Sequence, residues 1–179
     1  MDLGVNPMNE PLQAKVLVSS DRASDGLYDD LSGPAAYNWL EHHGFKVLGI
    51  QIIPDDRELL SQAIGSICQD GVALLVTSGG TGLGSRDVMP QVLDSICDYA
   101  IPGFGELLRR ESLRYSLNAY LSRCGGWVKQ RTLILALPGN PRAVCEQLDI
   151  LSDLLPHALK SLGDACNDRR PTPTVANHD

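Results

Sequence analysis

A glycine-rich stretch at residues 77–87, Thr-Ser-Gly-Gly-Thr-Gly-Leu-Gly-Ser-Arg-Asp, carries most of the chemically useful groups of the sequence. A backbone with this many glycines can reach positive φ and turn its N–H groups toward an anion; the glycines are Gly79, Gly80, Gly82 and Gly84. Side chains suited to a phosphate, a metal ion or a proton stand beside them at Ser78, Thr81, Ser85, Arg86 and Asp87. The stretch is either an ordinary glycine-rich turn or a phosphate site, and the hydroxyls with the Arg-Asp pair favour the phosphate site.

Three further polar stretches each follow a predicted strand. Ser20 and Asp21 begin the first, Asp55 lies in the second, and the third is Pro138-Gly139-Asn140. Residues 21–26 are either a solvated connection or a ligand loop. Asp55 also has two interpretations, because its spacing from Glu58 is that of a helix-capping pair. It either caps the next helix or acts as a functional carboxylate.

The elements that would position these residues follow from the apolar pattern. Strands are predicted over residues 14–20, 46–53, 72–77 and 131–137, with two short strands at 120–124 and 127–129 around a hairpin or bulge at Gly125-Gly126. Helices are predicted over residues 32–44, 55–69, 88–97, 107–116 and 142–162, the last broken near Pro156. Ser32 is expected near the N-cap of the first helix, and residues 101–106 are expected to form a tight turn.

Strands that alternate with helices predict an α/β protein, a three-layer α/β/α sandwich with a largely parallel sheet. The most apolar strand, residues 72–77, is expected near its centre. Loops after parallel strands meet at one edge, so the four polar stretches should converge there. We predict a flexible leader at residues 1–12, a single domain at 13–163 and a disordered tail at 164–179.

Composition narrows the function further. The net charge of −7 argues against nucleic-acid binding, so an anion would depend on local cations, such as the arginines of the 107–116 helix if these are not simply a solvated face. Five widely spaced cysteines, without a Cys-x-x-Cys pair, indicate neither a zinc site nor redox chemistry. No apolar window reaches the about 18 residues of a membrane span, and we expect a cytoplasmic protein.

Seven short motifs follow one another along the chain: Ser20-Asp21-Arg22, Ile53-Pro54-Asp55, Gly79-Gly80-Thr81-Gly82 with Arg86-Asp87-Val88, Pro102-Gly103-Phe104-Gly105-Glu106, Glu111-Ser112-Leu113, Leu121-Ser122-Arg123 and Leu137-Pro138-Gly139-Asn140-Pro141. In these motifs and their order, the chain resembles the MogA-type molybdopterin adenylyltransferases over residues 14–163. The resemblance implies the molybdopterin-binding fold and a transfer of adenylate from ATP to the terminal phosphate of molybdopterin, with release of pyrophosphate. It also implies a homotrimer that works beside a molybdenum-inserting enzyme.

The resemblance also assigns expected roles. Asp55 and Asp87 match the family's two functional aspartates, whose oxygens suit Mg²⁺ that keeps waters and phosphate oxygens. Positions expected to bind substrate are Ser20, Asp21, Ser78, Gly79, Gly80, Thr81, Gly82, Ser85, Arg86, Ser112, Ser122, Pro138, Gly139 and Asn140. Hydroxyls at Thr81, Ser112 and Ser122 would hold the pterin or its phosphate without adding negative charge.

One residue departs from the family pattern, and two other functions stay open. Met89 stands where the family has a threonine, so a hydroxyl that could cap the following helix is absent. The chain could instead be a molybdopterin-binding scaffold without catalysis, as in the MoaB branch, or a CinA-like nucleotide-processing enzyme on the same fold. The sequence argues against a classical P-loop kinase, because no Gly-Lys-Ser/Thr follows the glycines.

Overall fold

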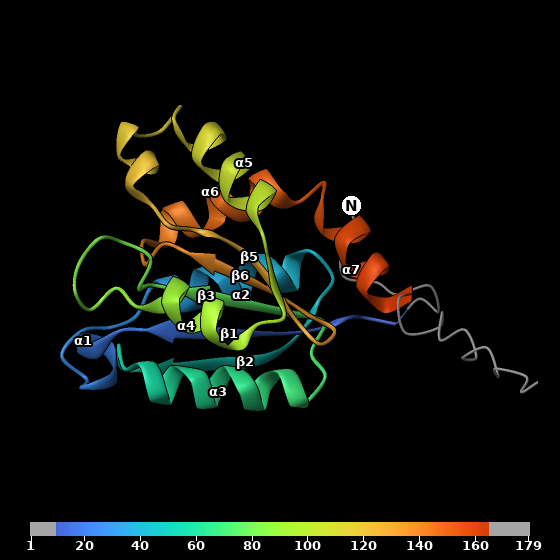
Figure 1. Cartoon of the computed structure of the whole chain (residues 1–179), viewed down its shortest axis with the longest axis horizontal. Coiled ribbons are helices and arrows are strands. Elements are labelled where there is room, and N and C mark those ends of the chain that lie inside the picture. The colour runs from blue at the N-terminus through green and yellow to red at the C-terminus, as the bar shows by residue number, and fades with distance from the viewer. Residues whose placement is uncertain (1–9, 165–179) are drawn as a thin grey trace, which may run out of the picture.

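The computed structural model describes residues 10–164, which form one six-stranded sheet covered by helices on both faces (Figure 1). The strand order is β2-β1-β3-β6-β5-β4. The first four of these strands run parallel, whereas β5 and β4 are antiparallel to their neighbours. The strands are β1 (Gln13–Ser19), β2 (Lys46–Ile53), β3 (Leu74–Ser78), β4 (Tyr99–Ile101), β5 (Gly125–Lys129) and β6 (Thr132–Leu137).

Helices cover the two faces unequally. The helices are α1 (Asp21–Ser24), α2 (Ser32–His42), α3 (Arg57–Gln69), α4 (Met89–Ile96), α5 (Pro102–Ser112), the 3-10 helix η1 (Leu117–Leu121), α6 (Pro141–Leu151) and α7 (Leu155–Asp164). One apolar cluster joins the sheet to α2, α5, α6 and α7, and a second joins the opposite face to α3 and α4. The predicted three-layer α/β fold with a largely parallel sheet is therefore confirmed, with β3 inside the sheet.

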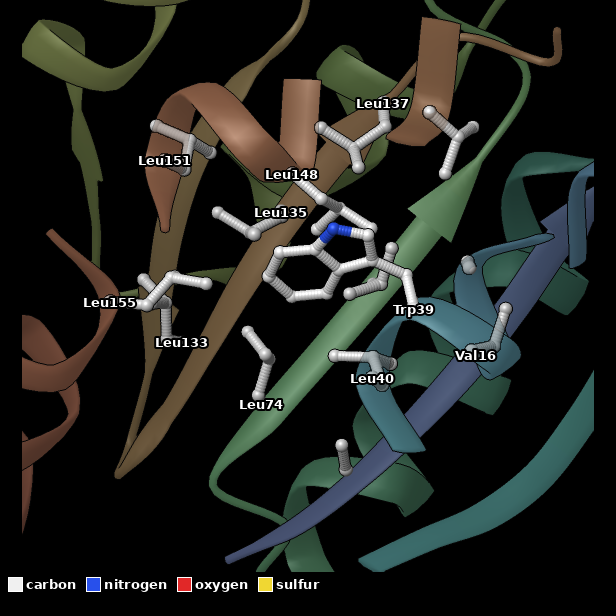
Figure 2. Packing of buried hydrophobic residues seen from close by; sticks show 14 of the residues in the cluster. Val16, Trp39, Leu40, Leu74, Leu133, Leu135, Leu137, Leu148, Leu151 and Leu155 are labelled. Carbon is white, nitrogen blue, oxygen red and sulfur yellow. The ribbon is translucent and has the colours of Figure 1, made fainter. Parts of the chain in front are cut away.

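The larger cluster is centred on Trp39 of α2, which lies over leucines of β3 and β6 and against α6 (Figure 2). The indole Nε1 donates to Asp149 Oδ1 at 2.7 Å, so the ring is held by a hydrogen bond as well as by packing. Each fully buried leucine in this layer contributes about 1.5–3 kcal/mol relative to an exposed one. This packing fixes the parallel strands side by side and so fixes the edge at which their carboxyl ends meet.

The predicted start of α2 at residue 32 is confirmed, whereas α3 begins two residues later than predicted. Ser32 is the first residue of α2, next to the N-cap position at Leu31, and the side chain of Asp30 accepts from Ser32 N through Oδ1 at 2.9 Å. The side chain of Asp56, not Asp55, caps α3 by accepting from Glu58 N at 2.9 Å and Leu59 N at 3.0 Å. The carboxylate of Asp55 is therefore not used in capping that helix.

The region after α4 differs most from the sequence-based prediction. Residues 102–106, predicted as a tight turn, are the first turns of α5, and residues 117–121 form η1 where a strand was expected near 120–124. Gly125 and Gly126 lie within β5, which pairs with β6. A Cβ at Gly126 would lie 2.6 Å from the ring of Phe104, so this glycine serves close packing and not a turn.

The predicted chain ends lie mostly outside the described residues. Leu12, at the end of the predicted leader, already packs against the core, and its carbonyl accepts from Lys46 N at 2.9 Å. Asp164, the first residue of the predicted tail, is the last residue of α7. No helix in residues 10–164 is long and apolar enough to cross a membrane. The cysteines of this range are free thiols, namely Cys68, Cys97, Cys124 and Cys145.

Candidate functional site

The carboxyl ends of four parallel strands meet at the edge where α1 and the glycine-rich loop lie (Figure 1). Ser20 N, just after β1, donates to Ile53 O at the end of β2 at 2.9 Å. Gly79 N donates to Leu137 O at 3.1 Å, which joins the end of β3 to that of β6. Ser78 Oγ donates to Pro138 O at 2.9 Å. The predicted convergence of the polar stretches is thus confirmed in the structure.

Asp55 is held at this edge by the segment that follows β1. Ser19 Oγ donates to Asp55 Oδ1 at 2.5 Å, and Asp21 N donates to Asp55 Oδ2 at 3.1 Å. In return, Asp55 N donates to Asp21 Oδ1 at 2.9 Å. Each carboxylate oxygen of Asp55 accepts one of these bonds, and an ionised carboxylate has about four acceptor positions in total. The orientation of Asp55 is therefore fixed while lone pairs remain for a ligand.

Asp21 connects Asp55 to the exit of the glycine-rich loop. Arg86 donates to both oxygens of Asp21, from Nε at 2.9 Å and from Nη2 at 2.8 Å. The hydrogen bond from Arg86, followed by the one from the Asp55 backbone, lowers the pKa of Asp21 below its ordinary value. Because Arg86 precedes Asp87 in the chain, this ion pair ties the two predicted catalytic aspartates to one neighbourhood.

The glycine-rich loop turns sharply as it leaves β3. Gly79 has φ +95 and Gly80 has φ +65, values that side chains rarely allow. A Cβ at Gly79 would lie 2.3 Å from Ser19 O, so the end of β3 passes directly against the end of β1. Further on, Gly84 N donates to Asp87 Oδ2 at 2.8 Å. The loop thereby fixes one oxygen of Asp87 with its own backbone.

Arg123 holds this loop from outside, and it was not among the site residues predicted from the sequence. Its Nε donates to Gly82 O at 2.8 Å and its Nη2 donates to Asp87 O at 2.6 Å. Its backbone N donates to Thr81 O at 3.0 Å. In the sequence, Arg123 was marked only by its place in the Leu121-Ser122-Arg123 motif, in which Ser122 was the residue predicted to bind substrate.

Behind the loop lies a cluster of small polar side chains. Cys124 Sγ lies 2.7 Å from Ser122 Oγ and donates to buried Thr81 Oγ1 at 3.5 Å. Burial raises the pKa of the Cys124 thiol, so this group stays protonated near neutral pH. On α5, Ser112 Oγ is buried without a hydrogen-bond partner in the described part of the chain. A buried hydroxyl of this kind retains capacity for a ligand or water.

A cavity of about 520 Å³ opens between the glycine-rich loop, α5, η1 and β5. Apolar and aromatic side chains dominate its wall, among them Leu83, Tyr120 and Trp127. Ser122 and the two arginines Arg109 and Arg123 add polar groups. A pocket of this size with a few polar groups is typical of a small-molecule site. Its place between the loop and η1 was not predicted, because residues 120–124 were expected to form a strand.

The remaining predicted residues take mixed roles. Ser20 caps α1 by accepting from Ala23 N at 3.2 Å, and Asn140 caps α6 by accepting from Ala143 N at 3.1 Å through its side-chain oxygen. Ser85 and Gly139 are exposed. Arg109, one of the α5 arginines, donates to the carbonyls of Ser122 and Cys124 at 3.3 Å each; Arg110 and Arg114 pair with Glu111 on the surface.

The carboxylates suit a hard cation only when other ligands complete its shell. No group of three or more His, Cys, Asp or Glu residues within residues 10–164 could by itself hold a metal ion. Asp55 and Asp87 supply two carboxylates, which fits Mg²⁺ bound through one or two carboxylates together with waters and substrate phosphates. The donor set therefore favours a metal that arrives with a phosphorylated ligand over a metal caged by the protein.

Several known proteins are similar to this chain in sequence and in fold. Residues 15–157 match the family described as "Probable molybdopterin binding domain". The molybdopterin adenylyltransferase of Helicobacter pylori is 37% identical over 147 residues, which are 80% of this chain and 84% of that protein. A solved structure named "anomalous substructure of MogA" has a TM-score of 0.80 and 38% identity, and covers 84% of this chain and 99% of that one. The MoaB structure from Thermus thermophilus has a TM-score of 0.79 and 34% identity, with coverages of 84% and 96%.

Proposed function

The chain belongs to the molybdopterin-binding family that its residues 15–157 match, and from this membership we infer that it is a molybdopterin adenylyltransferase of molybdenum cofactor biosynthesis. An oxygen of the terminal phosphate of molybdopterin attacks the α-phosphorus of ATP, a new P–O–P bond forms, and the bond to the β-phosphate breaks with release of pyrophosphate. Two anions must approach each other, so catalysis depends on positioning and on neutralisation of charge.

The sheet edge would carry the nucleotide side of this reaction. Asp55 and Asp87 would hold Mg²⁺, which neutralises the negative charge of the transferring phosphate when it is bound. The glycine-rich loop lies at the same edge, and its amides would bind phosphate oxygens through hydrogen bonds, apart from those of Gly79, Gly84 and Asp87, which donate within the protein. Arg86 donates to Asp21 from Nε at 2.9 Å and from Nη2 at 2.8 Å, and the other N–H groups of its guanidinium would donate to a phosphate oxygen.

The cavity between the loop and η1 would receive the pterin. Its aromatic and apolar wall suits a flat heterocycle, and Ser122, Arg109 and Arg123 supply the polar groups near the loop. The unpartnered Ser112 Oγ is a candidate for a further hydrogen bond to this substrate. Leu83 of the glycine-rich loop lines the same cavity, so a pterin bound there would lie beside the phosphate-binding backbone.

One observation carries this proposal: Asp55 and the residue before Asp87 are joined through the Asp21 carboxylate, so both aspartates lie at one ligand-accessible edge. Asp87→Asn tests it. The asparagine Oδ1 can still accept from Gly84 N, so the loop should stay folded and molybdopterin should still bind. Loss of the charge should lower the turnover roughly 10²–10³-fold. The assay follows pyrophosphate release with ATP, Mg²⁺ and molybdopterin, and mass spectrometry identifies adenylyl-molybdopterin.

Asp153→Asn is the matched control, because Asp153 is exposed beyond the far end of α6 and its substitution removes the same charge. Wild-type turnover in the Asp87→Asn variant would refute the role of Asp87. Molybdopterin binding without any pyrophosphate release by the wild-type protein would instead favour a scaffold like the MoaB branch. Adenylate transfer to another acceptor would favour a different nucleotide-processing enzyme.

We also propose the assembly that the family resemblance implies, namely a homotrimer in the cytoplasm that hands its product to a molybdenum-inserting enzyme. The adenylylated pterin is an activated substrate, so a following enzyme must consume the adenylate while it inserts the metal. Light scattering coupled to gel filtration tests the trimer, and a mass near that of one chain would contradict it.

A further inference from the structure

Arg123 stands out because its three hydrogen bonds to the glycine-rich loop all end on backbone carbonyls. The guanidinium reaches Gly82 O and Asp87 O, which lie five residues apart in the loop, and its own N–H reaches Thr81 O. The side chain is half-buried, which limits the exchange of these bonds with water. Hydrogen bonds from a charged donor are shorter and stronger than those between neutral groups. Arg123 therefore links the part of the loop near Gly82 to its last residue, Asp87.

The other bonds around Asp87 are short-range. Asp87 N donates to Gly84 O at 3.0 Å, and Gly84 N donates back to Asp87 Oδ2 at 2.8 Å. These bonds shape the turn, but they cannot fix its position relative to the rest of the protein. Arg86 ties the loop to Asp21 through an exposed pair, which water and salt weaken. Burial of Val88 and Met89 anchors the chain just after Asp87 in the core. Of the two side chains that bind the loop from outside, Arg123 makes the more protected link and bonds to the backbone of Asp87 itself.

Arg123 is itself held in a firm frame. Arg109 of α5 donates to the carbonyls of Ser122 and Cys124, the residues on either side of Arg123. A Cβ at Gly105 would lie 3.0 Å from Arg109 Nη2, so the guanidinium of Arg109 packs against the α5 backbone. The residues on both sides of Arg123 are therefore hydrogen-bonded to α5, and the Arg123 side chain connects this segment to the glycine-rich loop.

The same two arginines form part of the cavity wall, and Leu83 of the loop forms another part. A ligand in the cavity would therefore touch both the loop and the residue that holds the loop. Leu83 lies between the two residues whose carbonyls this guanidinium binds, directly after Gly82 and four residues before Asp87, so Arg123 contacts the loop on both sides of this wall residue.

We propose that Arg123 is the positioning residue of Asp87: it sets the place of the Asp87 carboxylate relative to a substrate in the cavity. The role requires arginine, because two separate carbonyls are bound by a planar fork that a lysine ammonium on one flexible stem cannot reproduce. This inference rests on the proposed adenylyl transfer, in which Asp87 acts on the transferring phosphate.

The test compares Arg123→Lys and Arg123→Met with the control Arg110→Met. Arg110 lies on the outer side of α5, where it pairs with Glu111, so its replacement removes a nearby charge without touching the loop. A misplacement of about 1 Å can cost about 10²-fold in rate. We expect kcat to fall about 100-fold in Arg123→Lys, with the KM for molybdopterin changed by less than about threefold because the cavity wall keeps its charge.

Hydrogen–deuterium exchange supplies a readout that does not depend on activity. In both Arg123 variants the amides of Gly84, Asp87 and Met89 should exchange at least about tenfold faster, because the loop they close is released, while those of β3 and β6 keep their wild-type rates. Slower turnover with unchanged exchange in the loop would overturn the positioning role, as would wild-type kcat in Arg123→Lys. Faster exchange throughout β3 and β6 would show general destabilisation and would also overturn it.

The two proposals fail in different ways. If the wild-type protein releases no pyrophosphate with molybdopterin, the proposed function fails, and the exchange data still show whether Arg123 holds the loop. If the wild-type protein is active and both Arg123 variants match it, the inference about Arg123 fails alone. A fall in molybdopterin affinity with kcat unchanged would assign Arg123 to substrate binding and contradict the positioning role.

Discussion

Gly79→Ala should destabilise the protein because the ends of β3 and β1 pass each other at this residue. Gly79 has φ +95, and an alanine with a positive φ is destabilised by roughly 1–2 kcal/mol relative to its ordinary conformations. Its Cβ would also lie 2.3 Å from Ser19 O, a backbone atom that can move only if β1 and β3 separate. The alanine also lowers the conformational entropy of the unfolded chain, but this stabilises the folded protein by only about 0.4–1 kcal/mol. We therefore expect a net loss of about 2–4 kcal/mol in the free energy of unfolding.

Urea unfolding measures this loss directly, and the melting temperature should fall by roughly 5–15 °C, given about 2–4 °C per kcal/mol for a chain of this size. Gly139→Ala is the matched control: its Cβ would lie 3.5 Å from Gly79 Cα, an ordinary contact, and its φ is not in the positive region. The control should stay within about 0.5 kcal/mol of the wild type. Equal losses in the two variants would refute the argument from the close approach of the strands.

Two further substitutions test the loop's surroundings. Met89→Thr introduces the residue that the family has at this position. Met89 is fully buried in the apolar cluster of α3 and α4, so the smaller side chain would leave a gap there and place a hydroxyl in the core, and the free energy of unfolding measured in urea should fall by about 2–3 kcal/mol. A gain in stability would show that helix capping by the threonine outweighs the lost packing. Asp21→Asn should lower the melting temperature at neutral pH, because it removes the ion pair with Arg86. That pair contributes fully only above the ordinary pKa of Asp21, 3.8, and its contribution is lost as the pH falls through the lowered pKa of Asp21 in the folded protein. The difference from the wild type should therefore shrink in acid, and a difference that stays constant from pH 7 to pH 2 would contradict this.

The sequence predicted the parallel strands and their shared edge because these depend on local apolar runs and on a topological rule. It could not predict which of two adjacent aspartates caps α3, since Asp55 and Asp56 both have a suitable spacing and only contacts with Ser19 and Asp21 decide between them. Those contacts join residues 34–36 positions apart. The same limit hid Arg123, whose partners in the loop are 36 and 41 positions away.

Glycines were a weaker guide after α4 than before it. Gly79 does have the positive φ that a turn requires, as the pattern predicted. The pattern also predicted a hairpin or bulge at Gly125 and Gly126, yet these residues pair in regular register within β5 and make room for Trp127 and Phe104. A glycine marks either a backbone conformation or a close approach, and the second depends on a partner that is distant in sequence. The predicted hairpin therefore failed where a tertiary contact, not a local one, required glycine.

The distribution of paired and unpaired arginines indicates where this acidic protein attracts an anion. In the described part of the chain, carboxylates neutralise Arg86, Arg110, Arg114 and Arg142. Arg109 and Arg123 instead donate to carbonyl oxygens, which orient a guanidinium without cancelling its charge. Both line the cavity beside the glycine-rich loop, so a net charge of −7 coexists with a local positive wall. The positive charges of Arg109 and Arg123 would attract the phosphate of a phosphorylated pterin to this cavity, next to the loop that carries Asp87.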